Sequence, residues 1–308
     1  MTIRVLKPGP STTVQDRGRF GYAHLGISPC GAADAVSLRI ANLLVGNEEY
    51  APALEMTLQG ATLEFGQSAV IAVAGARCEV KIGPYRIAQD AAFEVSAGGV
   101  LQCGTMSAGV RAYLAIRGGV DVPRVMGSAS TDLRGKFGGL EGRRLRAGDV
   151  TRGGRASGQR PGRLRTGALD PVESDAIRVT RGPQHDWFTE EAIARFLGNP
   201  YVVSEQSDRA GLRLTGEPIN PREQKQLLTD GIPLGAVQVP PDGQPILLFV
   251  DQQTTGGYPK IASVIAADMH RIGQLRPRDE VRFAEVSIAE AVEALHAQER
   301  WLAEIWES

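Results

Sequence analysis

Residues 61–116 read ATLEFGQSAVIAVAGARCEVKIGPYRIAQDAAFEVSAGGVLQCGTMSAGVRAYLAI, and this stretch decides the class of fold. It consists of short apolar runs interrupted by glycine, proline, serine or aspartate. Short runs bounded by such turn formers are typical of strands in an antiparallel sandwich or barrel. The runs are Leu63–Phe65, Val70–Val73, Glu79–Ile82, Phe93–Val95, Val100–Cys103 and Arg111–Ile116.

Similar runs fill the second half of the chain, and Asp242-Gly243 lies between two of them, a dipeptide that favours a tight β-hairpin. Helical patterns are fewer. Asp34 can begin one helix, Thr189 can cap another, and Lys260–Arg271 is expected to form a third. The 37 glycines and 18 prolines favour turns, so they fit many short strands better than a helical bundle. The chain is therefore predicted to be mainly β, with a few helices.

Residues 143–165 hold eight arginines among glycine, serine and glutamine, and they mark a domain boundary. Because no aromatic residues are present to stack on bases, a solvated linker is favoured over an RNA-binding patch. The C-terminal segment shows a Ser287–Glu290 capping box and apolar residues at three- and four-residue steps. We expect an N-terminal half at 1–155, a linker at 156–175, a C-terminal half at 176–286 and a C-terminal helix at 287–308.

Composition excludes several classes of function. Lys and Arg total 34 against 35 Asp and Glu, so neither nucleic acid nor an anionic membrane is expected as a partner. Cys30, Cys78 and Cys103 are widely spaced and the four histidines lack metal-like spacing, so no disulfide framework or metal site is expected. The N-terminus has no signal-peptide pattern, and no apolar run approaches the ~20 residues of a membrane span. A cytoplasmic protein is expected.

Familiar catalytic signatures are absent from the sequence. It contains no HExxH, GxSxG or GxGxxG pattern and no phosphate-binding loop ending in Lys-Ser or Lys-Thr. The chain is therefore not expected to hold ATP alone.

Two polar, glycine-rich segments in the first half are candidates for a binding site. In residues 8–19, glycines let backbone amides approach a ligand while an amide, a carboxylate and a guanidinium offer different hydrogen bonds. A turn with an internal Asp–Arg pair explains these residues equally well. In residues 127–132, turn capping is slightly favoured over ligand binding. The candidate substrate-binding residues are Gln15, Asp16, Arg19, Ser128, Ser130 and Thr131.

Two further segments lie in the second half. Residues 207–213 form a polar bend in which an acid and arginines can simply pair. Residues 251–260, DQQTTGGYPK, offer more functional groups than a structural turn needs, and their glycine amides could stabilise a carbonyl oxygen. Candidate catalytic residues are Asp251, which would orient substrate or water, and Tyr258 and Lys260, either of which could move a proton. Candidate substrate-binding residues are Asp208, Arg209, Gln253, Thr254, Thr255, Gly256 and Gly257.

In this order the segments resemble the KipA/PxpC family, described as the C-type subunit of 5-oxoprolinase or as allophanate hydrolase subunit 2. The similarity extends from Val5 to about Val286. The matching phrases include PGPSTTVQDRGRFGYAHLGISPCGAAD at 8–34, YLAIRGGVDVPRVMGSASTDL at 113–133, SDRAGLRLTG at 207–216, GAVQVPPDGQPI at 235–246 and DQQTTGGYPKIASVIAAD at 251–268.

The resemblance implies two cyclophilin-like β-barrel domains and hetero-oligomeric partners. It implies a KipI/PxpB-type subunit and a lactam-opening A-type subunit, which together with this chain hydrolyse 5-oxo-L-proline to L-glutamate. ATP would be used by the assembled complex. An alternative is the carboxyltransferase component of a biotin-dependent, urea-type carboxylase, with biotin on a separate carrier and a small amide as substrate. A third is a non-catalytic regulator that binds a KipI-type kinase inhibitor.

Overall fold

The computed structural model describes residues 1–155, 161–164, 175–222 and 227–307. Its contacts divide the chain into two compact units. Unit 1 comprises Met1–Phe20, Cys30–Ala168 and Ile305–Ser308, and unit 2 comprises Gly21–Pro29 and Leu169–Glu304. The expected linker at 156–175 falls outside the described residues except for 161–164 and 175. Within the described residues, no helix is both long and apolar enough to cross a membrane.

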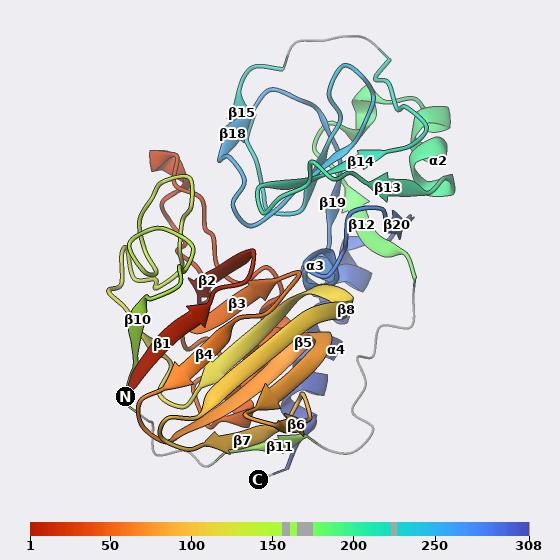
Figure 1. Ribbon diagram of the computed structural model, residues 1–308. Coiled ribbons are helices and arrows are strands. Elements are labelled where there is room, and N and C mark those ends of the chain that lie inside the picture. The colour runs from red at the N-terminus through yellow and green to blue at the C-terminus, as the bar shows by residue number, and fades with distance from the viewer. Residues whose placement is uncertain (156–160, 165–174, 223–226, 308) are drawn as a thin grey trace. The chain divides into compact units, whose positions relative to one another are not determined.

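Over the described residues, ten strands form the sheet of unit 1, which curls into a nearly closed β-barrel (Figure 1). The prediction of a mainly β chain is confirmed. The polar segment at 8–19 contains a strand, β2, which pairs with β3. The strands are β1 (Thr2–Lys7), β2 (Ser11–Gln15), β3 (Ala53–Thr57), β4 (Thr62–Phe65), β5 (Ala69–Ile82), β6 (Tyr85–Ile87), β7 (Ala92–Val95), β8 (Val100–Ile116), β9 (Val120–Asp121) and β10 (Val150–Gly153).

The long strand β8 organises this barrel. Its first half pairs with β4 and its second half with β3, while β5 runs along its other edge (Figure 1). β5 bends at Gly75, where φ is +98° and an added Cβ would lie 2.7 Å from the carbonyl oxygen of Arg111. Such kinks let a sheet curve toward closure. The enclosed core includes Ile3, Val5, Leu54, Leu63, Phe65, Ile71, Leu101 and Leu114.

Helix α1 (Ala35–Leu44) covers a second face of unit 1. Asp34 caps it by accepting hydrogen bonds from the backbone N–H of Ser37 (2.8 Å) and from its hydroxyl (2.6 Å), as predicted. The buried Tyr113 hydroxyl donates to Glu55 (2.6 Å) and accepts from the Asp34 backbone N–H (2.8 Å). Burial first, and then the neighbouring carboxylates, raise the pKa of Tyr113 well above its ordinary value. This network joins the start of α1 to the barrel wall.

Over the described residues, eight strands form the sheet of unit 2, which is also a nearly closed β-barrel. All its pairs are antiparallel except β12 with β21. β16 and β17 pair as a hairpin across Asp242-Gly243, as predicted, but residues 239–245 connect them, so the turn is not a tight one. The strands are β12 (Ile177–Arg181), β13 (Tyr201–Val203), β14 (Gly211–Thr215), β16 (Ala236–Gln238), β17 (Ile246–Leu248), β19 (Lys260–Val264), β20 (Glu280–Val281) and β21 (Phe283–Glu285).

The helices of unit 2 confirm two predicted caps and correct one prediction. Thr189 accepts from the Ala192 N–H (3.0 Å) at the start of α2 (Glu190–Gly198), and Ser287 and Glu290 exchange hydrogen bonds before α4 (Ile288–Glu304). The helix expected at 260–271 is wrong. Residues 260–264 form β19 because they pair with β12 and β16, and only the 3-10 turn η3 (Ala266–Asp268) and the short α3 (Met269–Ile272) follow.

Short elements complete the two units. After α4 the chain does not continue as a helix to residue 308, because Trp306–Glu307 forms β22, which pairs with β11 (Arg163–Leu164) in unit 1. The 3-10 turn η1 (Ala23–Leu25) lies in the unit 2 segment Gly21–Pro29, where the Ser28 hydroxyl donates to the carbonyl oxygen of Gln252. η2 (His185–Trp187) precedes α2, and β15 (Asp230–Gly231) pairs with β18 (Thr255–Gly256).

Candidate functional site

Asp16 is the centre of a buried polar cluster in unit 1. It follows β2 directly, and its side chain accepts hydrogen bonds from the hydroxyls of Ser128 (2.5 Å) and Ser130 (2.6 Å). It also accepts from the backbone N–H groups of Ala129 (2.7 Å) and Gly18 (2.8 Å). Hydrogen bonds to an ionised acceptor are roughly twice as strong as those between neutral groups. One carboxylate therefore holds together two loops more than 100 residues apart in sequence.

Gln15 and Thr131 extend this cluster along the end of β2. The Thr131 N–H and hydroxyl both donate to the carbonyl oxygen of Val14, at 2.9 and 3.0 Å. The Gln15 amide donates to the Thr13 hydroxyl (3.0 Å) and is fully buried, and its Oε1 has no hydrogen-bond partner among the described residues. The first two predicted segments are therefore brought together, and each also has the structural role that the sequence left open.

Arg19 is the least satisfied buried charge in the cluster. Its side chain is 2% exposed, lies 4.8 Å from the ring centroid of Phe137, and donates through Nη2 to the carbonyl oxygen of Ser130. Its Nε and Nη1 have no acceptor among the described residues. An unsatisfied buried donor is costly and therefore needs an explanation, for which an acceptor on an ordered water or on a bound ligand would suffice. Arg19 thus remains a candidate for binding.

A substitution at Gly138 would show how tightly this cluster is packed. It has φ +69°, and an added Cβ would lie 2.1 Å from the Ser130 carbonyl oxygen and 2.9 Å from Arg19 Nη2. We expect Gly138→Ala to lower the free energy of unfolding by about 3 kcal/mol, from left-handed strain plus overpacking. Gly127→Ala is the matched control, with φ +80° and nothing within 4 Å, and should cost only about 1 kcal/mol. Equal effects in urea denaturation would contradict this packing.

In unit 2, the buried Asp251 and the largely buried Arg209 form an ion pair. Arg209 Nε and Nη2 donate to the two carboxylate oxygens at 2.9 and 3.0 Å, and the Asp251 N–H donates to the Arg209 carbonyl oxygen (2.9 Å). Asp208 accepts from the N–H groups of Ala210 (2.8 Å) and Gly211 (3.2 Å), so it stabilises the bend. The third predicted segment thus meets the first residue of the fourth, with Arg209 paired to Asp251 rather than to its neighbour Asp208.

Lys260 is buried at the start of β19, and its side chain is 1% exposed. Its Nζ donates to Asp230 at 2.9 Å, and its backbone N–H donates to the Gln184 side chain (3.1 Å). The hydrogen bond from Lys260 is the main cause that lowers the pKa of Asp230 below its ordinary 3.8. Since a depressed carboxyl pKa stabilises the fold only above that pKa, this ion pair persists at neutral pH and is lost in more acidic solution.

Between Asp251 and Lys260, residues 253–258 lie at or near the surface, whereas Gln252 is buried. Thr255 and Gly256 form β18, the Thr254 carbonyl accepts from the Ile232 N–H (3.0 Å), and Gln253 is exposed. Gly257 and Tyr258, which is 44% exposed, line a cavity of ≈ 520 Å³ with prolines and Val239. The segment therefore presents Tyr258 to a cavity and buries Lys260. It precedes a strand, not the helix that was expected.

Sequence reasoning missed three residues that shape these clusters. Asp230 holds Lys260, Phe137 faces Arg19, and Gly138 leaves room for that guanidinium. The sequence offers only the Asp-Gly dipeptide at 230–231 and the Gly-Gly dipeptide at 138–139, which predict turns but do not indicate which side chains contact them. Among the residues that the structure describes, no group of three or more His, Cys, Asp or Glu side chains could hold a metal ion.

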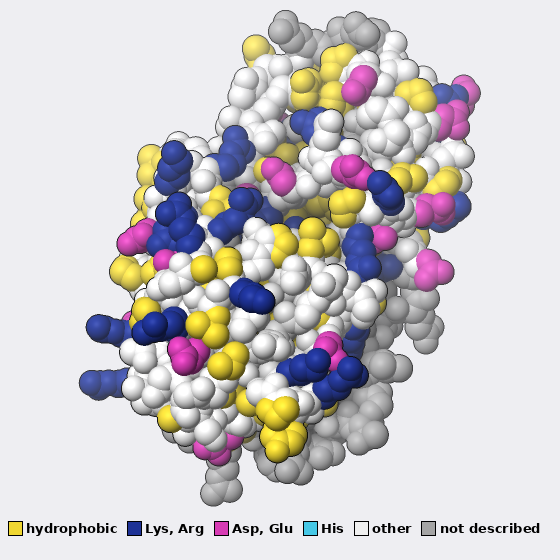
Figure 2. Space-filling model, in the orientation of Figure 1, with side chains coloured by type: hydrophobic (Ala, Val, Ile, Leu, Met, Phe, Trp, Pro, Cys, Tyr) yellow, Lys and Arg dark blue, Asp and Glu magenta, His cyan; other side chains and the backbone are white. Residues whose placement is uncertain are grey.

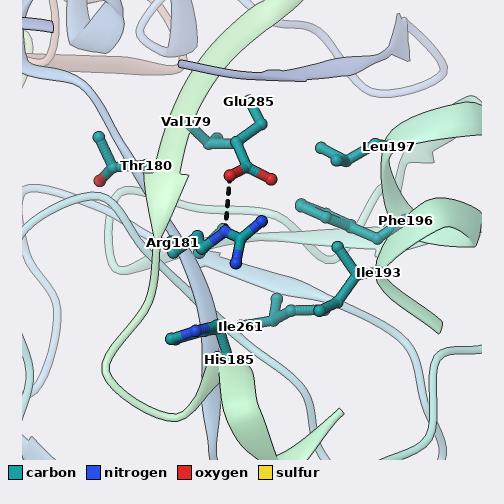
Figure 3. A pocket seen from close by; sticks show the side chains of 10 residues that line it. Val179, Thr180, Arg181, His185, Ile193, Phe196, Leu197, Ile261 and Glu285 are labelled. Carbon is teal, nitrogen blue, oxygen red and sulfur yellow. Dashed lines mark hydrogen bonds and ion pairs between the residues drawn. The ribbon is translucent and has the colours of Figure 1, made fainter. Parts of the chain in front are cut away.

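A separate hollow in unit 2 is too small for a substrate. It lies between α2 and the sheet, lined by Ile193, Phe196, Ile261 and His185, with Arg181 bonded to Glu285 beside it (Figure 3). Its volume of ≈ 10 Å³ is about that needed by one water molecule. The polar residues around Asp16 in unit 1 and those around Asp251 and Lys260 in unit 2 therefore remain the candidate functional sites.

Comparison with known proteins places this fold in a family. Residues 25–285 match the carboxyltransferase domain, subdomain A and B, and the chain belongs to this family. It is 41% identical over 303 residues to the C-type subunit of 5-oxoprolinase from Escherichia coli K12, covering 98% of this chain and 97% of that protein. The resemblance seen in the sequence is thereby confirmed.

Larger fungal proteins contain the same fold. The urea amidolyase of Lachancea kluyveri is 35% identical over 323 residues, covering 96% of this chain but 18% of that protein. The crystal structure of the K. lactis urea amidolyase superposes with a TM-score of 0.94 at 34% identity, covering all of this chain and 20% of that one. The chain thus spans about a fifth of these relatives, in contrast to its nearly full-length match with the bacterial subunit.

Proposed function

We propose that this chain is the C-type subunit of a cytoplasmic, ATP-dependent 5-oxoprolinase, which opens the lactam of 5-oxo-L-proline to give L-glutamate. The observation that carries the proposal is 41% identity across 97% of the C-type subunit from E. coli. Its partners would be a KipI/PxpB-type subunit and a lactam-opening A-type subunit. A relative of similar length at this level of identity favours the same role for this chain, rather than the role that the matching region has in the longer fungal enzymes.

The reaction requires help with a poorly reactive bond. Amide resonance gives the C–N bond partial double-bond character, so hydrolysis is assisted by donors that stabilise charge developing on the carbonyl oxygen. In unit 2, the buried Lys260 ammonium is such a donor, and the Asp251–Arg209 pair holds the segment that leads to it. We assign Lys260 to donating a hydrogen bond to the carbonyl oxygen of the substrate. Tyr258 would contact the substrate in the cavity that this tyrosine lines, and Asp251 would position the segment through its pair with Arg209. These roles are part of the proposal.

ATP is assigned to the complex and not to a helix N-terminus of this chain. Phosphates favour helix N-termini that are free of negative charge. In the described part of the chain, the helices of at least eight residues begin with carboxylates: Asp34 at α1, Glu190 and Glu191 at α2, and Glu290 at α4. These ends do not fit a triphosphate. No step of the proposed chemistry is routed through ATP on this chain.

The test is reconstitution with a KipI/PxpB-type subunit and a lactam-opening A-type subunit from the same organism. The assembled complex should release glutamate from 5-oxo-L-proline only when ATP is present, and this chain alone should release none. An intact three-subunit complex that leaves 5-oxo-L-proline unchanged would end the proposal. Size-exclusion chromatography of the mixture establishes beforehand that the complex has formed.

A second candidate function has its own support. The matched family is a carboxyltransferase family, and the fold superposes on urea amidolyase with a TM-score of 0.94. Under this alternative the chain would pass a carboxyl group from carboxybiotin on a separate carrier to an amide nitrogen. Bicarbonate-dependent carboxylation of urea, in the presence of a biotin carboxylase and a biotinylated carrier, would favour it over lactam hydrolysis.

A further inference from the structure

One polar cavity lies entirely in unit 1, and the lactam chemistry proposed for unit 2 does not use it. Its volume is ≈ 470 Å³, within the ~300–1,000 Å³ typical of small-molecule sites. Its walls come from the turn after β2, the segment between α1 and β3, Gly118, the loop after β9 and Arg155. In Figure 2, Lys and Arg side chains gather over the loops that join β9 to β10, together with a few acidic ones.

Three guanidinium groups line this cavity, those of Arg17, Arg124 and Arg155. Among the described residues, Arg17 and Arg155 have no acidic partner within ion-pair distance. Arg17 instead lies over the rings of Phe20 and Tyr50, at 5.9 and 5.5 Å from their centroids. Aromatic contacts position a guanidinium without neutralising its charge. Its positive charge and its hydrogen-bond donors therefore stay available to a ligand.

The acids of the cavity do not cancel these charges. They are Asp16 and Glu48, so two carboxylates stand against three guanidinium groups. Asp16 already accepts four hydrogen bonds within its own cluster, and Arg124 Nη1 lies 3.7 Å from it. Glu48 is exposed, so solvent screens its charge. The cavity therefore keeps an excess of positive charge that an anionic ligand would neutralise.

The main chain that carries Arg155 is fixed to the opposite wall of the cavity. The Gly154 N–H donates to the Gly119 carbonyl oxygen at 2.9 Å. Gly118 has φ +91°, and an added Cβ there would lie only 2.9 Å from the carbonyl carbon of Arg155. The Gly118 N–H in turn donates to the Asn47 Oδ1 at 2.7 Å. Because these backbone positions are set before any ligand arrives, the ordering cost of binding is reduced.

We propose that this cavity binds a phosphate group, either free or at the end of a small molecule, through Arg17, Arg124 and Arg155. A phosphate ester carries about −1.5 to −2 charge at pH 7 and three strong acceptor oxygens, whereas a carboxylate carries one charge and two oxygens. Guanidinium groups bind such oxygens through paired hydrogen bonds. Tyr50 and Pro52 line the same cavity and leave a less polar wall for the rest of an esterified molecule. The site is separate from lactam hydrolysis and does not rest on the proposed function.

Calorimetric titration of the full chain, which needs no turnover and no partner subunit, tests this site. The probes are inorganic phosphate, glycerol 3-phosphate, AMP and succinate. We expect all three phosphate compounds to bind more tightly than succinate, which offers only carboxylates. The tightest of the three identifies the source as free phosphate, a small ester or a nucleotide. Binding of succinate as tight as that of the phosphates, or no binding of any phosphate compound, overturns the inference.

Variants with opposite expected effects place the binding in this cavity. Arg17→Gln/Arg155→Gln should weaken binding of the tightest phosphate compound by at least ~10-fold, because charge-assisted hydrogen bonds are lost. Glu48→Gln should strengthen it ~2–5-fold, because an exposed like charge is removed. Arg4→Gln is the matched control and should change nothing, since this exposed arginine of β1 lies outside the cavity. Wild-type affinity in the double variant, or weaker binding by Glu48→Gln, overturns the site.

Discussion

Replacing Asp16 with alanine is expected to lower the free energy of unfolding by about 4 kcal/mol, among the largest effects in the chain. The change leaves two hydroxyls and two backbone N–H groups without their shared acceptor in a site that is 3% exposed. Each buried donor left unsatisfied costs about 1–3 kcal/mol, reduced where a side chain can turn away. Urea denaturation, followed by circular dichroism, measures the loss.

Two companion variants make the Asp16 result specific. Asp16→Asn keeps one acceptor oxygen but presents an amide N–H₂ to the donors, so roughly half of the loss is expected. Asp121→Ala removes an exposed carboxylate from β9 of the same unit and should stay within about 0.5 kcal/mol of the wild type. If Asp16→Ala were as stable as Asp121→Ala, the cluster would not be what joins the two loops.

Replacing Lys260 with methionine is expected to reduce ATP-dependent glutamate release by the reconstituted complex ~10²–10³-fold, the range for losing one donor that stabilises charge on the carbonyl oxygen. The fold should survive. Methionine fills the volume of the lysine stem, and the abandoned partner Asp230 has a side chain that is 54% exposed, so water can replace the ammonium. Thermal unfolding of the variant, run beside the assay, checks this.

Asp230→Asn is the control that distinguishes chemistry from structure. It removes the ion pair but keeps the Lys260 ammonium, so less than ~10-fold of activity should be lost if the ammonium acts on the substrate. A purely structural pair predicts the opposite, with both variants impaired to the same degree. Glutamate release that is unaffected by Lys260→Met would remove this residue from the mechanism.

Local rules predicted the fold where neighbouring residues decide the outcome. The caps at Asp34, Thr189 and Ser287 are confirmed because each depends on groups within a few positions. The prediction of a helix at Lys260–Arg271 was wrong for the opposite reason. Its first residues pair with β12 and β16, and strand pairing overrides local helix preference when the partners are distant in sequence.

The same distinction applies to the candidate site. The residue types were visible in the polar segments, and the structure brings Asp16 to Ser128 and Asp251 to Arg209. It also shows which polar groups are used internally. Asp208 serves the bend, whereas Arg19 keeps two donors without acceptors among the described residues. The catalytic roles of Asp251, Tyr258 and Lys260 stay predictions.

Glycine spacing, apolar alternation and capping residues were enough to predict a mainly β chain. These patterns depend on residues a few positions apart, so they can be read without knowing the distant contacts. Three features required the folded chain: the donors around Asp16, the burial of Lys260 against Asp230, and the arginine-lined cavity of unit 1. Each joins residues at least 30 positions apart. Hydrogen bonding and desolvation at such separations are set by packing, which no local pattern encodes.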